Sequence, residues 1–110
     1  MAAPRTPYLT QVKSVTETTG TITLTPYDSG VVLIGNTATM NVALPPAASC
    51  KGVAYQFIKT SANAVAITVD PNASEMINGA TSYASMDAGY DSVEIVCNGS
   101  AWFVANAKIA

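Results

Sequence analysis

Residues 91–106 read DSVEIVCNGSAWFVAN, and this stretch decides the fold class. Apolar side chains fall on every second position before the turn, which indicates a half-buried β-strand. They are Val93, Ile95 and Cys97. Asn98-Gly99-Ser100 marks the turn, because Asn and Gly accept the positive φ angles of tight hairpins. The alternation resumes at Trp102, Val104 and Asn106, so we predict a β-hairpin over residues 93–106.

The same rhythm extends back to Gly20. Alternating apolar positions recur in four earlier stretches: Ile22 and Leu24; Met40, Val42 and Leu44; Val53, Tyr55 and Phe57; Val65, Ile67 and Val69. Turn residues separate these stretches at roughly 8- to 12-residue intervals, which is typical of all-β domains. No stretch carries the i, i+3, i+4, i+7 pattern of an amphipathic helix. We predict a small antiparallel β-sandwich, jelly-roll-like, or a small barrel.

Two stretches depart from simple alternation. Residues 31–34, Val-Val-Leu-Ile, are apolar on both faces, which predicts a central strand covered on both sides. Residues 1–19 hold two prolines, which favour an extended entry over a helix. We expect residues 1–19 to be either an extended arm that lies on a neighbouring subunit or an edge strand, and residues 20–110 to form one β-sandwich domain.

The composition points away from several function classes. Charged residues make up 11% of the chain, against roughly 25% in typical soluble domains, so either other subunits or a neutral Thr/Ser surface must cover the fold. We favour assembly. Five scattered basic residues and a net charge of −2 argue against nucleic acid. No apolar run reaches the roughly 18 residues of a membrane span, and residues 1–7 lack a secretory core, so we expect cytoplasmic synthesis.

The residues do not compose a catalytic or metal site. Histidine is absent, and Lys59 or Lys108 would serve as a base only if an apolar pocket lowered its pKa. The acidic candidates for a glycosidase pair are interpreted as turn or strand residues; they are Asp70, Glu75, Asp87, Asp91 and Glu94. Residues 87–91 lack the further ligands of a calcium loop. We therefore predict no enzyme, no cofactor and no metal.

The aromatic residues and cysteines leave two questions open. Trp102 and Tyr55 lie in strand patterns and are expected in the core. Tyr27, Tyr83 and Tyr90 lie in predicted loops and are candidates for exposed ligand contacts, such as sugar stacking. Cys50 and Cys97 each adjoin a turn; a bridge between them is possible, but without an oxidising compartment we favour free thiols.

Five groups of turn and strand residues recur along the chain: Leu24-Thr-x-x-Asp28-Ser29-Gly30, Leu44-Pro45, Gly52-x-x-Tyr55-x-Phe57, Ile77-x-Gly79, and Asp91-Ser92-Val93 with Asn98-Gly99-Ser100-x-Trp102. Together they resemble the small β-domains of tailed-bacteriophage structural proteins. They cover residues 20–107 and are similar to capsid decoration (cement) proteins, head fibres and tail fibres. Cys50 and Cys97 stand where the pattern has ordinary small or polar residues.

The resemblance implies a virion structural protein, often trimeric, with no catalytic residues. The chain starts at Met1 and stops two residues after Lys108, which we interpret as a free-standing gene product and hence as a decoration protein. The expected partners are the major capsid protein and further copies of the chain, and the expected location is the capsid surface, after synthesis in the host cytoplasm. Tyr8, Leu9, Val12 and Val15 are the expected shell contacts. The alternative is a fibre or receptor-binding tip that recognises host glycans.

Overall fold

The fold is all-β in the computed structural model, which describes residues 12–16 and 20–110. Two short 3-10 turns, η1 (Pro26–Asp28) and η2 (Ala47–Ser49), interrupt the strands. Within the described residues the strands are β1 (Val12–Val15), β2 (Gly20–Thr23), β3 (Gly30–Ile34), β4 (Met40–Ala43), β5 (Ala54–Lys59), β6 (Ile67–Asp70), β7 (Tyr83–Met86), β8 (Ser92–Cys97) and β9 (Trp102–Lys108).

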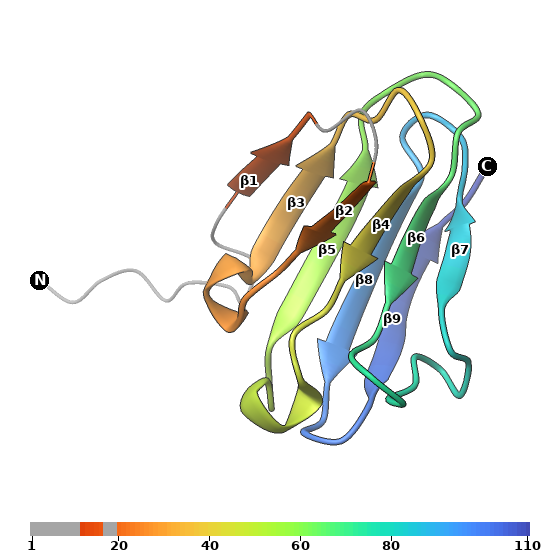
Figure 1. Ribbon diagram of the computed structural model, residues 1–110. Helices are drawn as coiled ribbons and strands as arrows, with labels where there is room; N and C mark the ends of the chain where they lie inside the picture. Colours follow the sequence, from red (N-terminus) through yellow and green to blue (C-terminus); the bar gives the residue numbers. More distant parts are fainter. Residues whose placement is uncertain (1–11, 17–19) are drawn as a thin grey trace, which may run out of the picture.

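The strands form two sheets that pack face to face (Figure 1). Sheet A has the order β1-β3-β5-β8-β9, and sheet B has the order β2-β4-β6-β7. In sheet A, β1, β3 and β5 run parallel, and β8 and β9 continue the sheet antiparallel. Sheet B repeats this plan, with β2, β4 and β6 parallel and β7 antiparallel. Both sheets are therefore mixed.

The expected antiparallel sandwich is correct as a two-layer all-β fold but wrong in its pairing. From β1 to β6, successive strands alternate between the two sheets, so each return to a sheet runs parallel to the strand before it. Parallel strands need a long crossover, and here the strand of the opposite sheet, with its two loops, supplies it. This winding excludes a jelly roll, and the sheets do not close into a barrel.

The predicted hairpin at the carboxyl end is confirmed. Cys97 pairs with Trp102 across the turn, and β8 and β9 stay antiparallel along their length. A register shift at residues 94–95 moves Asn106 opposite Glu94, so Asn106 lies on the outer face rather than with Trp102. Asn78 and Gly79 form a second Asn-Gly pair, and their φ angles of 50° and 77° suit the type I′ turn that such a pair favours.

The core lies between the sheets, and the alternating residues fill it as predicted. Tyr55, Phe57 and Trp102 are each 0% exposed. The Tyr55 ring centroid lies 5.8 Å from that of Phe57 and 5.7 Å from that of Trp102. The Tyr55 hydroxyl donates to the Thr25 carbonyl at 2.7 Å, which satisfies its polar end inside the core. Core positions of Trp102 and Tyr55 are thus confirmed.

The prediction for residues 31–34 is half correct. Val32 and Ile34 of β3 point inward and are fully buried. Val31 and Leu33 point outward and are only half-buried, since no described element packs on the outer face of sheet A. Strand β3 also lies next to the edge strand β1 rather than at the centre of the sheet. Its sequence is that of a strand covered on both faces, but the described chain covers only one.

Candidate functional site: the open edge between β1 and β2

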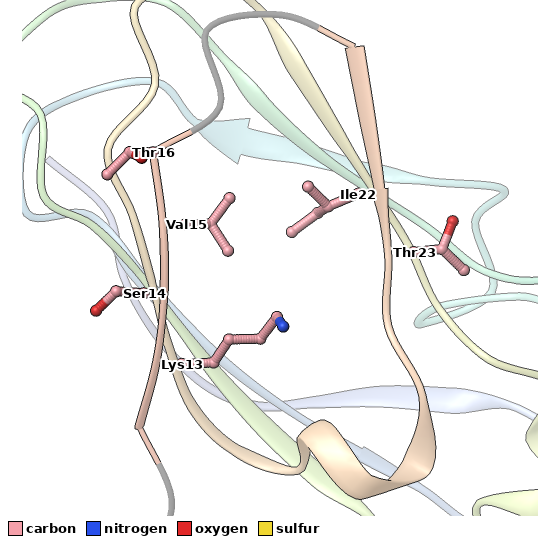
Figure 2. A pocket seen from close by; sticks show the side chains of 6 residues that line it. All are labelled: Lys13, Ser14, Val15, Thr16, Ile22 and Thr23. Atoms are coloured by element: carbon pink, nitrogen blue, oxygen red, sulfur yellow. The ribbon is translucent and has the colours of Figure 1, made fainter.

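A hollow of about 430 Å³ opens where the two sheets end, between their edge strands β1 and β2. Its lining residues are Lys13, Ser14, Val15, Thr16, Ile22 and Thr23. Figure 2 shows that the side chains of Lys13, Val15 and Ile22 point into the hollow, whereas Ser14, Thr16 and Thr23 point away. Two apolar side chains, Val15 and Ile22, and the Lys13 side chain therefore face the hollow, and its other lining residues are polar.

The cation at this edge is paired. Lys13 Nζ lies 3.7 Å from Asp28 Oδ1, and the two side chains are 44% and 24% exposed. Asp28 is held in place by η1, because its Oδ2 accepts hydrogen bonds from the Thr25 backbone N–H at 2.9 Å and from the Thr25 hydroxyl at 3.2 Å. An exposed ion pair contributes little to stability, so Lys13 stays available to an incoming acidic group.

The predicted contact residues separate into different environments. Val15 lines the hollow and is 8% exposed, while Val12 lies on the opposite side of β1 and is 67% exposed. The two positions differ by an odd number of residues on one strand, so they cannot contact the same flat surface. Residues 12–15 pair with β3 and form the edge strand that was one of the two expectations. Tyr8 and Leu9 lie outside the described residues.

The three candidate tyrosines do not form one platform. Tyr27 of η1 is 86% exposed and lies just before the start of β3. Tyr90 is 70% exposed, and its backbone N–H donates to the Lys59 carbonyl. Lys59 ends β5, which runs parallel to β3, so it lies at the far end of the sheet from Tyr27. The length of a five-residue strand, about 15 Å, therefore separates them. Tyr83 was expected in a loop, but it begins β7 and packs against the core. Two exposed aromatic sites remain, at opposite ends of the sandwich.

A buried polar cluster around Lys59 was not predicted. Lys59 is 0% exposed, and its Nζ donates to Asn36 Oδ1 at 3.0 Å, Ser61 Oγ at 2.7 Å and Asn63 Oδ1 at 2.6 Å. Burial lowers the pKa of Lys59 from its usual 10.5, and the charges of Asp91 and Asp87 partly oppose that shift. The sequence did contain a signal for this burial: Lys59 follows Tyr55 and Phe57 at two-residue spacing, so it lies on the same inward face of β5.

The geometry at Lys59 is similar to that of a Ser–Lys catalytic pair. Ser61 lies within hydrogen-bond distance of the amine, as a nucleophile beside its base would. Ser61 Oγ, however, donates to Asn36 Oδ1 at 2.9 Å, and the hollows of about 430, 340 and 260 Å³ in the described part of the chain are not lined by Lys59 or Ser61. The cluster joins the loops after β3 and β5, which is a structural role.

The carboxylates are engaged singly. Both oxygens of Glu75 lie 3.1 Å from the Ala47 backbone nitrogen at the start of η2. Asp91 Oδ2 accepts from the backbone N–H groups of Asp87 and Ala88, and its Oδ1 accepts from that of Ala110. Strand β8 separates the Ala47 end of the molecule from Asp91, because Cys97 contacts Ala47 and Asp91 directly precedes Ser92. Asp91 thus makes the local turn bonds that its position predicted.

The cysteines are free thiols in the interior. Cys50 and Cys97 are both buried and unbridged. Burial raises the pKa of each thiol, so both are poor nucleophiles at neutral pH. Among the described residues, no group of three or more acidic or cysteine side chains is placed to hold a metal ion. Nor does that part of the chain contain a helix of the length and apolarity needed to cross a membrane.

No model of a known protein family matches the chain, and no curated protein matches it.

Proposed function

We propose that this protein is a bacteriophage capsid decoration protein that binds the outer surface of the assembled shell and stabilises it. The open edge between β1 and β2 carries the proposal, because among the described residues it offers two apolar side chains, a cation and two strand edges without a neighbouring strand in one place. The motif pattern over residues 20–107 and the low charge of the chain support the same interpretation.

The proposed mechanism is mechanical rather than chemical. A protein that binds only the assembled shell stabilises it by mass action, since dissociation of the shell must also release the bound protein. A segment of a shell subunit that adds to the edge of β1 or β2 gains backbone hydrogen bonds, and an apolar side chain gains burial against Val15 and Ile22. Several copies linked as an oligomer would make weak single contacts collectively tight.

The test is co-sedimentation of the protein with purified empty heads of the phage that encodes it. Ile22→Asp places a charge in the hollow, and we expect it to weaken binding at least tenfold, because the carboxylate would be desolvated on binding. Thr68→Asp, on the outer face of sheet B, is the matched control and should bind normally. Circular dichroism would verify that both variants fold. Equal binding of the two variants would exclude the edge as the shell contact.

The residues before β1 allow a separate test of the expected arm. Tyr8 and Leu9 are expected shell contacts, so a variant that lacks residues 1–11 should lose affinity for the heads. If this deletion leaves binding unchanged while Ile22→Asp abolishes it, the contact lies at the hollow and the arm has no part in it.

A receptor-binding fibre tip is the second candidate, and the exposure of Tyr27 and Tyr90 favours it. Exposed aromatic rings stack on sugar faces, and both rings lie at loops between strands, where ligand contacts are common. A glycan array with the wild type, Tyr27→Ala and Tyr90→Ala decides between the candidates. Saturable sugar binding that one substitution abolishes would support the fibre tip; no binding to any glycan would exclude it.

A further inference from the structure

The outer faces of the two sheets differ in chemistry. The outward residues of sheet B are mainly polar: Thr21, Thr23, Asn41, Thr68 and Asp70. The outward residues of sheet A combine the polar Ser14, Gln56, Ser92 and Asn106 with a larger apolar set: Val12, Val31, Leu33, Ile58, Val96 and Phe103. Val12 and Phe103 are 67% and 42% exposed and lie on β1 and β9, so the apolar surface extends from one edge of sheet A to the other.

On the outer face of sheet A, the sequence of β3 is typical of a strand that is buried on both sides. Strand β3 carries Val31 and Leu33 outward between the inward Val32 and Ile34, which is the doubly apolar pattern of a strand buried on both faces. A shallow hollow of about 340 Å³ adds relief to the same face, lined by Gly52, Ala54, Glu94, Val96 and Ala105. Phe103 pairs with Val96 across the β8–β9 ladder and therefore stands beside this hollow.

The charges on this face suit a second copy of the chain. Glu94 is the acidic group on the face, and Lys108 lies on the same side of the sheet, opposite Ser92. The β1–β3–β5 half carries no charged outward residue among those described. A copy turned end for end can set its Lys108 against Glu94, so that pairing buries no net charge. A membrane surface or nucleic acid would instead require a group of cations, which this face lacks.

The size of the face sets the strength of such a pairing. Five strands spaced about 4.8 Å apart, each with about six residues rising about 3.3 Å, cover roughly 500 Å² in projection. A standard stable interface buries about 800 Å² per partner, so this face by itself supports a weak pair with a dissociation constant in the micromolar range or above.

We propose that the outer face of sheet A is a self-association surface that docks a second copy of this chain, face to face. The proposal rests on the chemistry of this face and is independent of shell binding, which uses the edge between β1 and β2. Self-association would leave the Thr-rich face of sheet B exposed to solvent on both copies.

Sedimentation-velocity measurements over a concentration series, from micromolar to millimolar, test the proposal. We expect the wild type to shift from monomer toward dimer and Leu33→Asp to stay monomeric, with a dissociation constant raised at least tenfold. Asn41→Asp, outward on β4 of sheet B, is the matched control and should associate like the wild type. A wild type that stays monomeric throughout, or a Leu33→Asp variant that associates normally, would overturn the proposal.

Charge reversal distinguishes face-to-face pairing from nonspecific adhesion of an apolar surface. Glu94→Lys and Lys108→Glu should each weaken association severalfold, because like charges then meet across the interface. The double variant Glu94→Lys/Lys108→Glu should restore it. If both single variants weaken association and the double variant weakens it further, the two residues do not face each other and the end-for-end arrangement is wrong. Circular dichroism and thermal unfolding of each variant ensure that the loss is not one of folding.

Discussion

Lys59 places an ammonium group in the interior without a carboxylate in contact with it. Transfer of a charge from water is costly, and the cost is offset here by the oxygens of Asn36, Ser61 and Asn63, which accept all three ammonium hydrogens. Asn36 extends the cluster, since its Nδ2 lies within hydrogen-bond distance of the Ala38, Val65 and Ala66 carbonyls. Lys59 and Asn36 together hold the loops that follow β3 and β5 at one end of the sandwich.

We expect Lys59→Met to lower the free energy of unfolding by about 2 to 4 kcal/mol, because the buried Asn36 and the half-buried Ser61 and Asn63 lose their charged donor. Urea denaturation measures the change. Lys51→Met is the matched control, since Lys51 is exposed, and it should change stability by less than about 0.5 kcal/mol. A Lys59→Met variant as stable as the wild type would mean that desolvation of the ammonium cancels its hydrogen bonds, as it does in some buried ion pairs.

Tyr55 is also a buried ionisable group, and it affects the free energy of unfolding at high pH. Burial, with minor contributions from Cys50, Asp28 and Cys97, raises the pKa of the Tyr55 hydroxyl above its usual 10.0. Above about pH 10 the folded chain therefore holds a proton that the unfolded chain has lost. The free energy of unfolding then falls as pH rises, by up to about 1.4 kcal/mol per pH unit.

The other shifted groups set the pH window. The raised thiol pKa values of Cys50 and Cys97 add a fall in stability that begins near their usual 9.0. The lowered pKa of Lys59 acts oppositely, because the unfolded chain binds more protons, and its gain is complete by its usual 10.5. We expect a net fall above about pH 10.5, and Tyr55→Phe should reduce its slope in urea titrations at about pH 8, 10 and 11. An unchanged slope would exclude Tyr55 as a source.

At the scale of elements, one carboxylate joins two loops that are distant in sequence. Glu75, in the loop between β6 and β7, accepts from the backbone N–H of Ala47, the first residue of η2. Pro46 precedes η2 and offers no side-chain cap, so Glu75 takes the place that a Ser or Asp usually fills. Glu75 was a candidate for an acidic pair, and its carboxylate instead caps η2.

Glu75→Ala should lower the free energy of unfolding by about 1 kcal/mol, because a backbone donor loses a charged acceptor. Glu75→Gln keeps an acceptor oxygen and should lose less. Thermal or urea unfolding of the two variants gives the comparison, and Asp70→Ala, an outward strand carboxylate on sheet B, serves as the control. Equal losses in Glu75→Ala and Glu75→Gln would show that charge, rather than the hydrogen bond, supplies the stabilisation.

At the scale of the whole molecule, the winding of β1 to β6 leaves β1 and β2 as the open edges of two sheets at one side. The chain thus presents a hollow at that side and an apolar face on sheet A. These two surfaces point in different directions, so binding at the edge and self-association on the face can occur together. A self-associated pair of copies would then present two of the proposed shell-binding edges to the repeating capsid surface. Binding of one edge would raise the effective affinity of the other.

The local sequence determined the strands, their inward residues and the tight turns. Alternation marked Tyr55, Phe57 and Trp102 as core, and Asn-Gly pairs marked both turns, because these signals depend on side chains a few residues apart. Tyr83 was misplaced because β7 is short and its pairing with β6 is irregular.

Only the tertiary structure decided which strands pair and what the remaining residues do. Alternation is the same in parallel and antiparallel strands, so the return of β5 beside β3 followed from the crossover through sheet B. The burial of Lys59 among three oxygens and the separation of Tyr27 from Tyr90 depend on loops that meet only in the folded chain. The sequence alone showed that residues 31–34 are apolar on both faces of the strand. The fold showed that Val31 and Leu33 point outward, on the face that we propose a second copy covers.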